Sequence, residues 1–250
     1  MLKVGLRSDF TDYYDFAFAG SWQEADVTLD RFSTDGPSRA DALRLLLSLG
    51  LRVPTWGRVR ELVPHLLASW TDATLAQTLE SVVVYTDEHA HCGEGKLQMR
   101  IGDALAQYPD ALASRFIPSG SGAGSVSLRY LRLGVRQFWL RYSSANDWRS
   151  NCGDVTVEVL TEEKRVDAPR WQEGPLARHV LFAIDFVPAD RLFAVDFNVA
   201  PGLRGSGIED LVSPAEAVEA LGEALLARRT YLAGDAVRFK HDKKGEPHAG

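Results

Sequence analysis

The most constraining feature of this sequence is a pair of apolar segments near its C-terminal end. Leu181 to Val187 reads LFAIDFV and Leu192 to Phe197 reads LFAVDF, with the turn-forming residues PADR between them. Short, nearly continuous apolar runs joined by a turn predict the two buried strands of a hairpin. The chain has 250 residues, which is enough to bury such strands in one large domain or two small ones.

Three polar residues interrupt this apolar hairpin: Asp185, Asp196 and Asn198. Residues two apart on a strand point to the same face, so Asp196 and Asn198 project together, and Asp185 on the partner strand can join them. Two buried carboxylates are costly unless a cation neutralises them, and Mg²⁺ prefers carboxylate and amide oxygens. We therefore predict a metal site, ahead of the alternative that Asp196 and Asn198 cap the turn before Pro201.

Composition and charge argue against several classes of protein. The formal net charge of −6 argues against a sequence-independent nucleic-acid binder, and no apolar run approaches a membrane span. Only two cysteines occur, Cys92 and Cys152, so no disulfide framework is implied. The first ten residues lack the apolar region of a signal peptide. These features predict a cytoplasmic protein that does not contact membranes.

Regular elements are predicted along most of the remaining chain. Ala42, Leu45, Leu46 and Leu49 share one face of a helix that Ser38 caps and Gly50 ends. A capping box at Ser213 to Glu216 begins another helix. Further helices are expected at 59–70 and 103–107, and strands at 2–6, 81–86, 97–101, 113–117, 128–134, 138–142 and 154–160.

Four segments together resemble the ATP-grasp superfamily of carboxylate–amine ligases. The hairpin segments IDFV and VDFNVAPGLRGSG resemble its C-terminal half, and DWRSNCGDV resembles its basic-x-Asn-x-Gly segment. VVVYTDEHAHCGEGK resembles its strand and phosphate loop, and SRADALRLLLSLGLRVPTWG resembles the entry to its nucleotide domain. The resemblance covers about residues 38–226. It implies an α+β fold with two subdomains whose antiparallel sheets sandwich a nucleotide.

The resemblance also implies roles for individual residues. It assigns the magnesium ligands to Asp185, Asp196 and Asn198, with Asp185 also at the ATP site, and catalysis to Arg149 and Asn151. It assigns the binding of the ATP phosphates to Gly93, Glu94, Gly95 and Lys96. The chain departs from the family twice: the middle metal ligand is Asp196 instead of glutamate, and Tyr85 stands where the family usually has a lysine.

The implied activity is ATP- and Mg²⁺-dependent ligation of a carboxylate to an amine through an acylphosphate. The substrates would be small molecules or peptides, and a homodimer would complete the substrate cleft. The implied organisation is a reduced N-terminal segment at 1–37, a nucleotide-binding domain at 38–234 and a disordered tail at 235–250.

Several alternatives stay open. A catalytically reduced nucleotide-binding or interaction protein would explain Tyr85. A nucleic-acid-modifying ligase could use Arg129, Arg132, Arg136 and Arg141, although alternating strand faces would divide them. His89, His91 and Cys92, with Cys152, contain zinc-type ligands without a standard spacing. Arg149 could form only an ion pair with Asp147 or Asp154.

Overall fold

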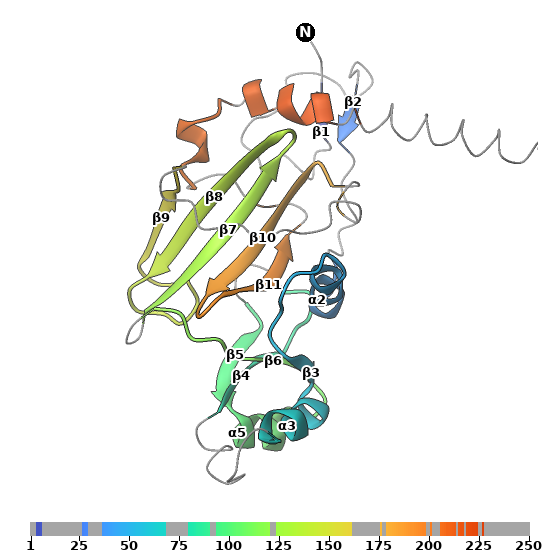
Figure 1. Ribbon diagram of the computed structural model, residues 1–250, viewed down its shortest axis with the longest axis vertical. Coiled ribbons are helices and arrows are strands. Elements are labelled where there is room, and N and C mark those ends of the chain that lie inside the picture. Colours follow the sequence, from blue (N-terminus) through green and yellow to red (C-terminus); the bar gives the residue numbers. More distant parts are fainter. Residues whose placement is uncertain are drawn as a thin grey trace, which may run out of the picture.

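The chain is described here by a computed structural model (Figure 1). The structure describes residues 4–6, 27–29, 37–68, 80–90, 94–120, 124–161, 176, 179–198, 201, 206–213, 215–217, 219–224 and 227. These residues form two antiparallel sheets with flanking helices, which confirms the predicted α+β class. Most of the predicted N-terminal segment and all of the predicted tail, residues 235–250, lie outside the described residues.

The larger sheet contains five antiparallel strands in the order β11-β10-β7-β8-β9. They are β7 (Ser125–Leu133), β8 (Arg136–Ser144), β9 (Val155–Val159), β10 (Leu181–Pro188) and β11 (Leu192–Asn198). The predicted hairpin is confirmed as β10 and β11, which pair directly. Strand β11 lies at the edge of the sheet and β10 lies inside it, so the polar residues of the hairpin all belong to this sheet.

The smaller sheet has the order β3-β6-β4-β5. Its strands are β3 (Trp56–Arg58), β4 (Ser81–Tyr85), β5 (Lys96–Arg100) and β6 (Leu112–Arg115). The predicted return strand after the glycine-containing loop is confirmed as β5. Two short strands, β1 (Val4–Leu6) and β2 (Val27–Leu29), form a separate parallel pair. The sequence pattern did not predict β2 or β3.

Two helices cover one face of the smaller sheet: α3 (Val59–Leu67) and α5 (Ile101–Gln107). Val82 and Val84 point into this layer and pack with Val59, Leu62 and Ile101. Strand alternation sends Tyr85 and Lys96 to the opposite face, toward the larger sheet. In the part of the chain that the structure describes, no helix has the length and apolar composition needed to span a membrane.

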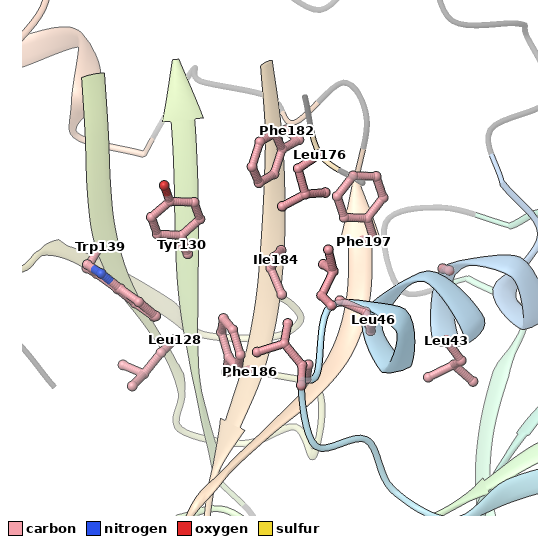
Figure 2. Close-up of a cluster of buried hydrophobic side chains, with 14 residues drawn as sticks. Leu43, Leu46, Leu128, Tyr130, Trp139, Leu176, Phe182, Ile184, Phe186 and Phe197 are labelled. Carbon is pink, nitrogen blue, oxygen red and sulfur yellow. The ribbon is translucent and has the colours of Figure 1, made fainter. Parts of the chain in front are cut away.

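Helix α2 (Arg39–Ser48) lies beside β11 and starts where the two sheets meet (Figure 1). Ser38 caps it by accepting the backbone N–H of Asp41 at 3.2 Å, and Gly50 follows it with a φ of +79°, as predicted. Figure 2 shows Leu46 beside the side chains of the larger sheet, and Leu43 belongs to the same buried cluster. This packing fixes the N-terminus of α2 next to β11.

The other face of the larger sheet is covered by its own apolar cluster. Ile208 of the 3₁₀ helix η4 (Ile208–Asp210), Val212, Ala217 and Leu221 pack there against strand residues such as Leu131. The predicted capping box is confirmed: the Ser213 N–H donates to Glu216 Oε2 at 2.9 Å. Leu181 and Ala183 of β10 belong to this cluster, and Asp185 is the next residue of β10 on the same face.

Gly134→Ala should destabilise the protein more than Gly50→Ala, although both glycines have a positive φ of +61° and +79°. A Cβ at Gly134 would overlap the carbonyl oxygen of Ala220, whereas a Cβ at Gly50 would meet nothing within 4 Å. We expect a loss of about 1 kcal/mol for Gly50→Ala and at least about 2 kcal/mol for Gly134→Ala. Chemical denaturation of both variants measures these losses of stability. Equal losses would contradict the close approach of Gly134 to the Ala220 carbonyl.

Candidate functional site

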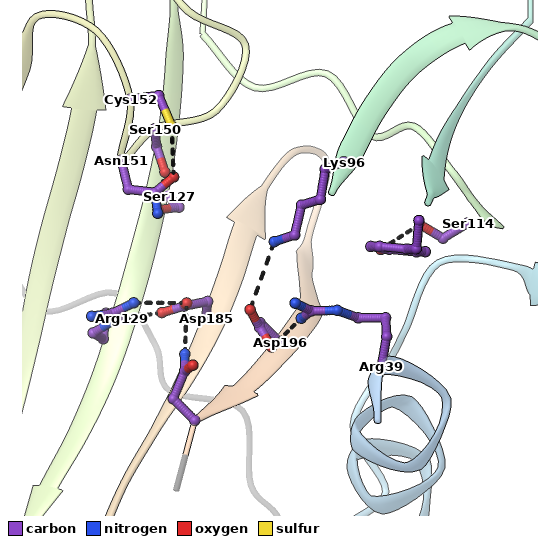
Figure 3. A network of polar contacts seen from close by, with 12 residues as sticks. Arg39, Lys96, Ser114, Ser127, Arg129, Ser150, Asn151, Cys152, Asp185 and Asp196 are labelled. Carbon is purple, nitrogen blue, oxygen red and sulfur yellow. Dashed lines mark hydrogen bonds and ion pairs between the residues drawn. The ribbon is translucent and has the colours of Figure 1, made fainter. Parts of the chain in front are cut away.

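Strand register brings the polar residues of the hairpin into one row. Asp196 on β11 lies opposite Asp185 on β10, and Asp185 lies opposite Arg129 on β7. Residues directly opposite each other on neighbouring strands project to the same face, so the three side chains meet. Asn198, two residues after Asp196, joins them by donating Nδ2–H to Asp185 Oδ2 at 3.2 Å (Figure 3).

Arg129 and Asp185 form a two-point ion pair. Arg129 Nε donates to Asp185 Oδ1 at 2.7 Å, and Nη2 donates to Oδ2 at 2.9 Å. Both side chains are largely buried, with 17% and 18% exposed. Burial alone would lower the pKa of Arg129, but the Asp185 carboxylate outweighs it and raises that pKa. The guanidinium also lies 4.9 Å from the centre of the Tyr142 ring.

Asp196 joins the two sheets and α2. Arg39, the first residue of α2, forms an ion pair with Asp196 Oδ1. Lys96 reaches from β5 of the smaller sheet and places Nζ 3.8 Å from Asp196 Oδ2 (Figure 3). Burial alone would raise the pKa of Asp196, but the charges of Arg39 and Lys96 outweigh it and hold that pKa below its ordinary value. The carboxylate therefore stays ionised at neutral pH.

Tyr85 supports this cluster without adding a charge. It lies opposite Lys96 in the pairing of β4 with β5, and its hydroxyl is 3.0 Å from Ser114 Oγ. The Arg39 guanidinium lies 5.3 Å from the centre of its ring. Burial raises the pKa of Tyr85, so the phenol is neutral. Tyr85 therefore places an aromatic ring where the resemblance expects a lysine. The ammonium group comes instead from Lys96 on the neighbouring strand β5.

The Lys96 amine should titrate below its ordinary pKa of 10.5, because burial lowers its pKa more than Asp196 raises it. Asp196→Asn removes that raising charge, so the pKa should fall further in this variant. Carbon-13 NMR of the lysine ε-carbon, assigned by its absence in Lys96→Arg, measures both values. A wild-type pKa at or above 10.5, or an upward shift in Asp196→Asn, would contradict this arrangement.

The donor set suits magnesium only when further negative charge is present. Asp185, Asp196 and Asn198 offer two carboxylates and an amide on one face, which suits a hard cation. However, Arg39, Lys96 and Arg129 give these two carboxylates three cationic neighbours, so the cluster carries a formal charge of +1. A lone Mg²⁺ would meet repulsion, whereas a polyphosphate could pair with the three cations and release the carboxylates. The residues therefore fit Mg²⁺ together with a polyphosphate.

The buried carboxylates are neutralised by other groups than the sequence-based prediction expected. That prediction expected a metal ion to neutralise them, and in the structure arginine and lysine side chains do so. The sequence-based prediction did not single out Arg39, and it considered Arg129 only as a contact for nucleic acid. A basic residue just after the cap of α2 was the available signal for Arg39, and the register of β7 with β10 was needed for Arg129.

The predicted catalytic residues lie on the loop after β8. Figure 3 shows Asn151 and Cys152 near the Arg129–Asp185 pair, with Ser150 beside Ser127 of β7. The Arg149 guanidinium is ion-paired with Asp147, with Nη2 2.9 Å from Oδ2, as the sequence alternative stated. Asn151 is exposed. The structure thus places this loop beside the cluster, and the catalytic roles of Arg149 and Asn151 remain predictions.

The predicted phosphate loop connects β4 to β5. Gly95 has a φ of +62°, its carbonyl accepts the Thr86 N–H at 2.8 Å, and a Cβ would lie 3.0 Å from that of Ala90. Glu94 is exposed, and Gly93 lies outside the described residues. His91 and Cys92 of the zinc alternative also lie outside them. Within the described ranges, no three His, Cys, Asp or Glu side chains are grouped as metal ligands.

The four arginines considered for nucleic-acid binding are divided by the register. Arg129 belongs to the ionic cluster, whereas Arg132 lies on the opposite face, 5.6 Å from the centre of the Phe182 ring. Arg141 shares that opposite face, because it pairs with Leu128. Arg136 forms an exposed ion pair with Glu216. These side chains therefore do not form a single basic groove.

Comparison with known proteins gives structural matches only. No family model and no curated protein matches the sequence. Among solved structures, the chain is similar to a RiPP-associated ATP-grasp ligase from Chryseobacterium gregarium in complex with ADP and peptides, with 13% identity and a TM-score of 0.48. The macrocyclase MdnC from Microcystis aeruginosa MRC matches with 16% identity and a TM-score of 0.45. D-Alanine-D-alanine ligase from Helicobacter pylori matches with 13% identity and a TM-score of 0.41.

These matches cover 82%, 80% and 76% of this chain in the same order. They cover 65%, 64% and 59% of the other chains, so this chain spans less than two-thirds of their length. The C. gregarium and H. pylori proteins are named as ligases.

Proposed function

We propose that this chain is an ATP- and Mg²⁺-dependent ligase that joins a carboxylate to an amine. The observation that carries the proposal is the ionic cluster: two carboxylates and an amide on one sheet face, surrounded by three cations from three different elements. Such a combination has little purpose in a packed core, where burying charge is costly. It suits a bound polyphosphate with its metal ion.

Each part of the cluster would take a separate role with ATP. Lys96, Arg39 and Arg129 would pair with phosphate oxygens, because guanidinium and ammonium groups bind oxyanions well. Asp185, Asp196 and Asn198 would hold Mg²⁺ once their cationic partners turn to the phosphates. When bound, Mg²⁺ would neutralise charge on the transferred phosphoryl group. The smaller sheet would cover the nucleotide through Lys96.

The reaction would proceed in two balanced steps. A substrate carboxylate oxygen attacks the γ-phosphorus of ATP, the bond to the β-phosphate oxygen breaks, and ADP leaves. An amine then attacks the acylphosphate carbonyl, phosphate leaves with the bonding electron pair, and the amine loses a proton. Arg149, with Asn151 beside it, would stabilise the tetrahedral oxyanion of the second step after exchanging its partner Asp147.

A second candidate is a nucleotide-binding protein without ligase activity. Tyr85 favours it, because a buried neutral phenol occupies the strand position where the resemblance expects a phosphate-binding lysine. The Arg149–Asp147 ion pair is also compatible with it. In that case the cluster would bind Mg²⁺ and ATP but transfer no phosphoryl group.

Trapping the acylphosphate separates the two candidates. The protein would be incubated with ATP, Mg²⁺, hydroxylamine and a panel of amino acids, dicarboxylates and short peptides, and hydroxamate and ADP would be measured. The ligase proposal predicts equal amounts of hydroxamate and ADP for at least one carboxylate, with both lost in Asp185→Asn. ATP binding without ADP formation for any member of the panel would favour the second candidate.

A further inference from the structure

Tyr85 presents a buried aromatic ring on the face of the smaller sheet that turns toward the larger sheet. Only 6% of the residue is exposed, and it packs with Ala40, Val83 and Leu112 in a small apolar cluster. Its hydroxyl lies 3.0 Å from Ser114 Oγ, within hydrogen-bond distance. Because packing fixes the ring and the hydrogen bond fixes its far end, Tyr85 offers a rigid surface to its neighbours.

The guanidinium of Arg39 lies over this ring, with Cζ 5.3 Å from the ring centre. An arginine at this distance is attracted to the ring face, and the attraction is stronger where water is excluded. The Arg39 side chain is only 7% exposed, so little water competes for it. Its backbone N–H also donates to the Glu88 carbonyl at 2.8 Å. Arg39 is therefore fixed at its backbone as well as at its guanidinium.

Asp196 cannot be the lasting partner of Arg39 at a nucleotide site. In the proposed function Asp196 turns to Mg²⁺, and its ion pair with Arg39 must then loosen. An aromatic ring attracts a guanidinium through its face and takes up none of the N–H donors that bind oxyanions. The ring of Tyr85 can therefore hold the guanidinium both before and after a phosphate group replaces the carboxylate.

A neutral residue at position 85 also suits the charges around it. Lys96 lies directly opposite Tyr85 on β5, and Arg39 comes from α2 to lie over the ring. A lysine at position 85 would place a third cation beside these two in a buried region, where like charges disfavour one another strongly. A neutral ring attracts one of the two cations instead. The start of α2 can therefore supply the charge that β4 does not carry.

We infer that Tyr85 is a positioning residue whose ring holds the Arg39 guanidinium where the two sheets meet, so that Arg39 binds a phosphate group there. The role of Arg39 toward phosphate rests on the proposed function, whereas the hold of the ring on the guanidinium does not. Tyr85 then belongs to a working nucleotide site, and its presence does not indicate a loss of ligase activity.

Calorimetric titration of MgATP into single and double variants tests the inference. Tyr85→Met should weaken binding about fivefold, because the guanidinium loses its ring contact, and Tyr85→Phe should stay within twofold of the wild type. In an Arg39→Met background, Tyr85→Met should have no further effect, whereas a merely structural role would weaken binding equally in both backgrounds. Tyr108→Met is the matched control, because Tyr108 packs in the α3 and α5 layer, and it should leave affinity unchanged.

Hydrogen exchange of the Arg39 Nε–H gives a second measurement that needs no nucleotide. Nitrogen-15 NMR follows this group, which is assigned by its absence in Arg39→Met. In the wild type it should exchange at least tenfold more slowly than the Nε–H of Arg60, an exposed arginine of α3. Tyr85→Met should accelerate its exchange at least tenfold, whereas Tyr85→Phe and Tyr108→Met should not change it. Tyr85→Leu gives the same comparison if Tyr85→Met does not fold.

Three results would overturn the inference: unchanged MgATP affinity in Tyr85→Met, an equal loss of affinity in both Arg39 backgrounds, or wild-type exchange at Arg39 as fast as at Arg60. If the wild type binds MgATP and one of these results appears, only this inference fails. If exchange behaves as expected and the wild type does not bind MgATP, the ligase function fails, and the hold of Tyr85 on Arg39 stands.

Discussion

Replacing Asp185 by alanine is expected to lower the free energy of unfolding by about 3 kcal/mol. The substitution removes the carboxylate that accepts two hydrogen bonds from Arg129 and leaves a guanidinium that is only 17% exposed without that partner. The remaining member of a buried pair cannot recover its hydration, so its loss costs more than the pair itself contributes. Denaturant unfolding followed by tryptophan fluorescence measures the change.

Asp190→Ala is the matched control for this prediction. Asp190 lies in the turn of the same hairpin, is 65% exposed and pairs with its neighbour Arg191, so its loss should change the free energy of unfolding very little. The double variant Asp185→Ala, Arg129→Met should recover much of the lost stability, because it removes both charges. A loss for Asp185→Ala no larger than for Asp190→Ala would show that the pair is not buried as described.

Replacing Lys96 by methionine is expected to weaken MgATP binding about tenfold to hundredfold. Lys96 is the cation that the smaller sheet contributes to the cluster, and a charge-assisted contact with phosphate is worth about 1.5 to 3 kcal/mol. The fold should tolerate the change, because methionine fills a similar volume and burial already opposes the charge on this amine. Calorimetric titration of ATP in the presence of Mg²⁺ measures the affinity.

Lys96→Arg keeps the charge and should retain affinity within about tenfold of the wild type. Arg60→Met, an exposed position on α3 of the same subdomain, should not change affinity. Wild-type MgATP affinity in Lys96→Met would contradict the assignment of Lys96 to the phosphates. The stability of each variant, measured by the same denaturant titration, separates a binding effect from partial unfolding.

The hairpin part of the site could be predicted because it depends only on residues that are close together in the sequence. Alternation fixes which residues of one strand share a face, and the short PADR turn brings the partner strand back. Asp185, Asp196 and Asn198 could therefore be grouped from the sequence alone, and their register confirms that grouping. The helix at Ser38 was predictable for the same reason, since its cap, apolar stripe and Gly50 lie within thirteen residues.

Arg39 and Arg129 could not be predicted as partners of these carboxylates, because each contact depends on tertiary structure. Arg39 lies 157 positions before Asp196 in the chain and meets it only because α2 packs beside β11. Arg129 meets Asp185 only because β7 pairs with β10 across a long crossover. Strand β3 was missed because its three residues are too few for alternation to appear.

The most direct test of the central claim is calorimetric titration of ATP into the wild type and into Asp196→Asn, each with and without Mg²⁺. The cluster predicts ATP binding to the wild type that weakens at least tenfold without Mg²⁺, and little effect of Mg²⁺ in Asp196→Asn. Asp190→Asn serves as the control and should behave as the wild type. Failure of ATP to bind the wild type in the presence of Mg²⁺, or binding that does not depend on Mg²⁺, would contradict the claim.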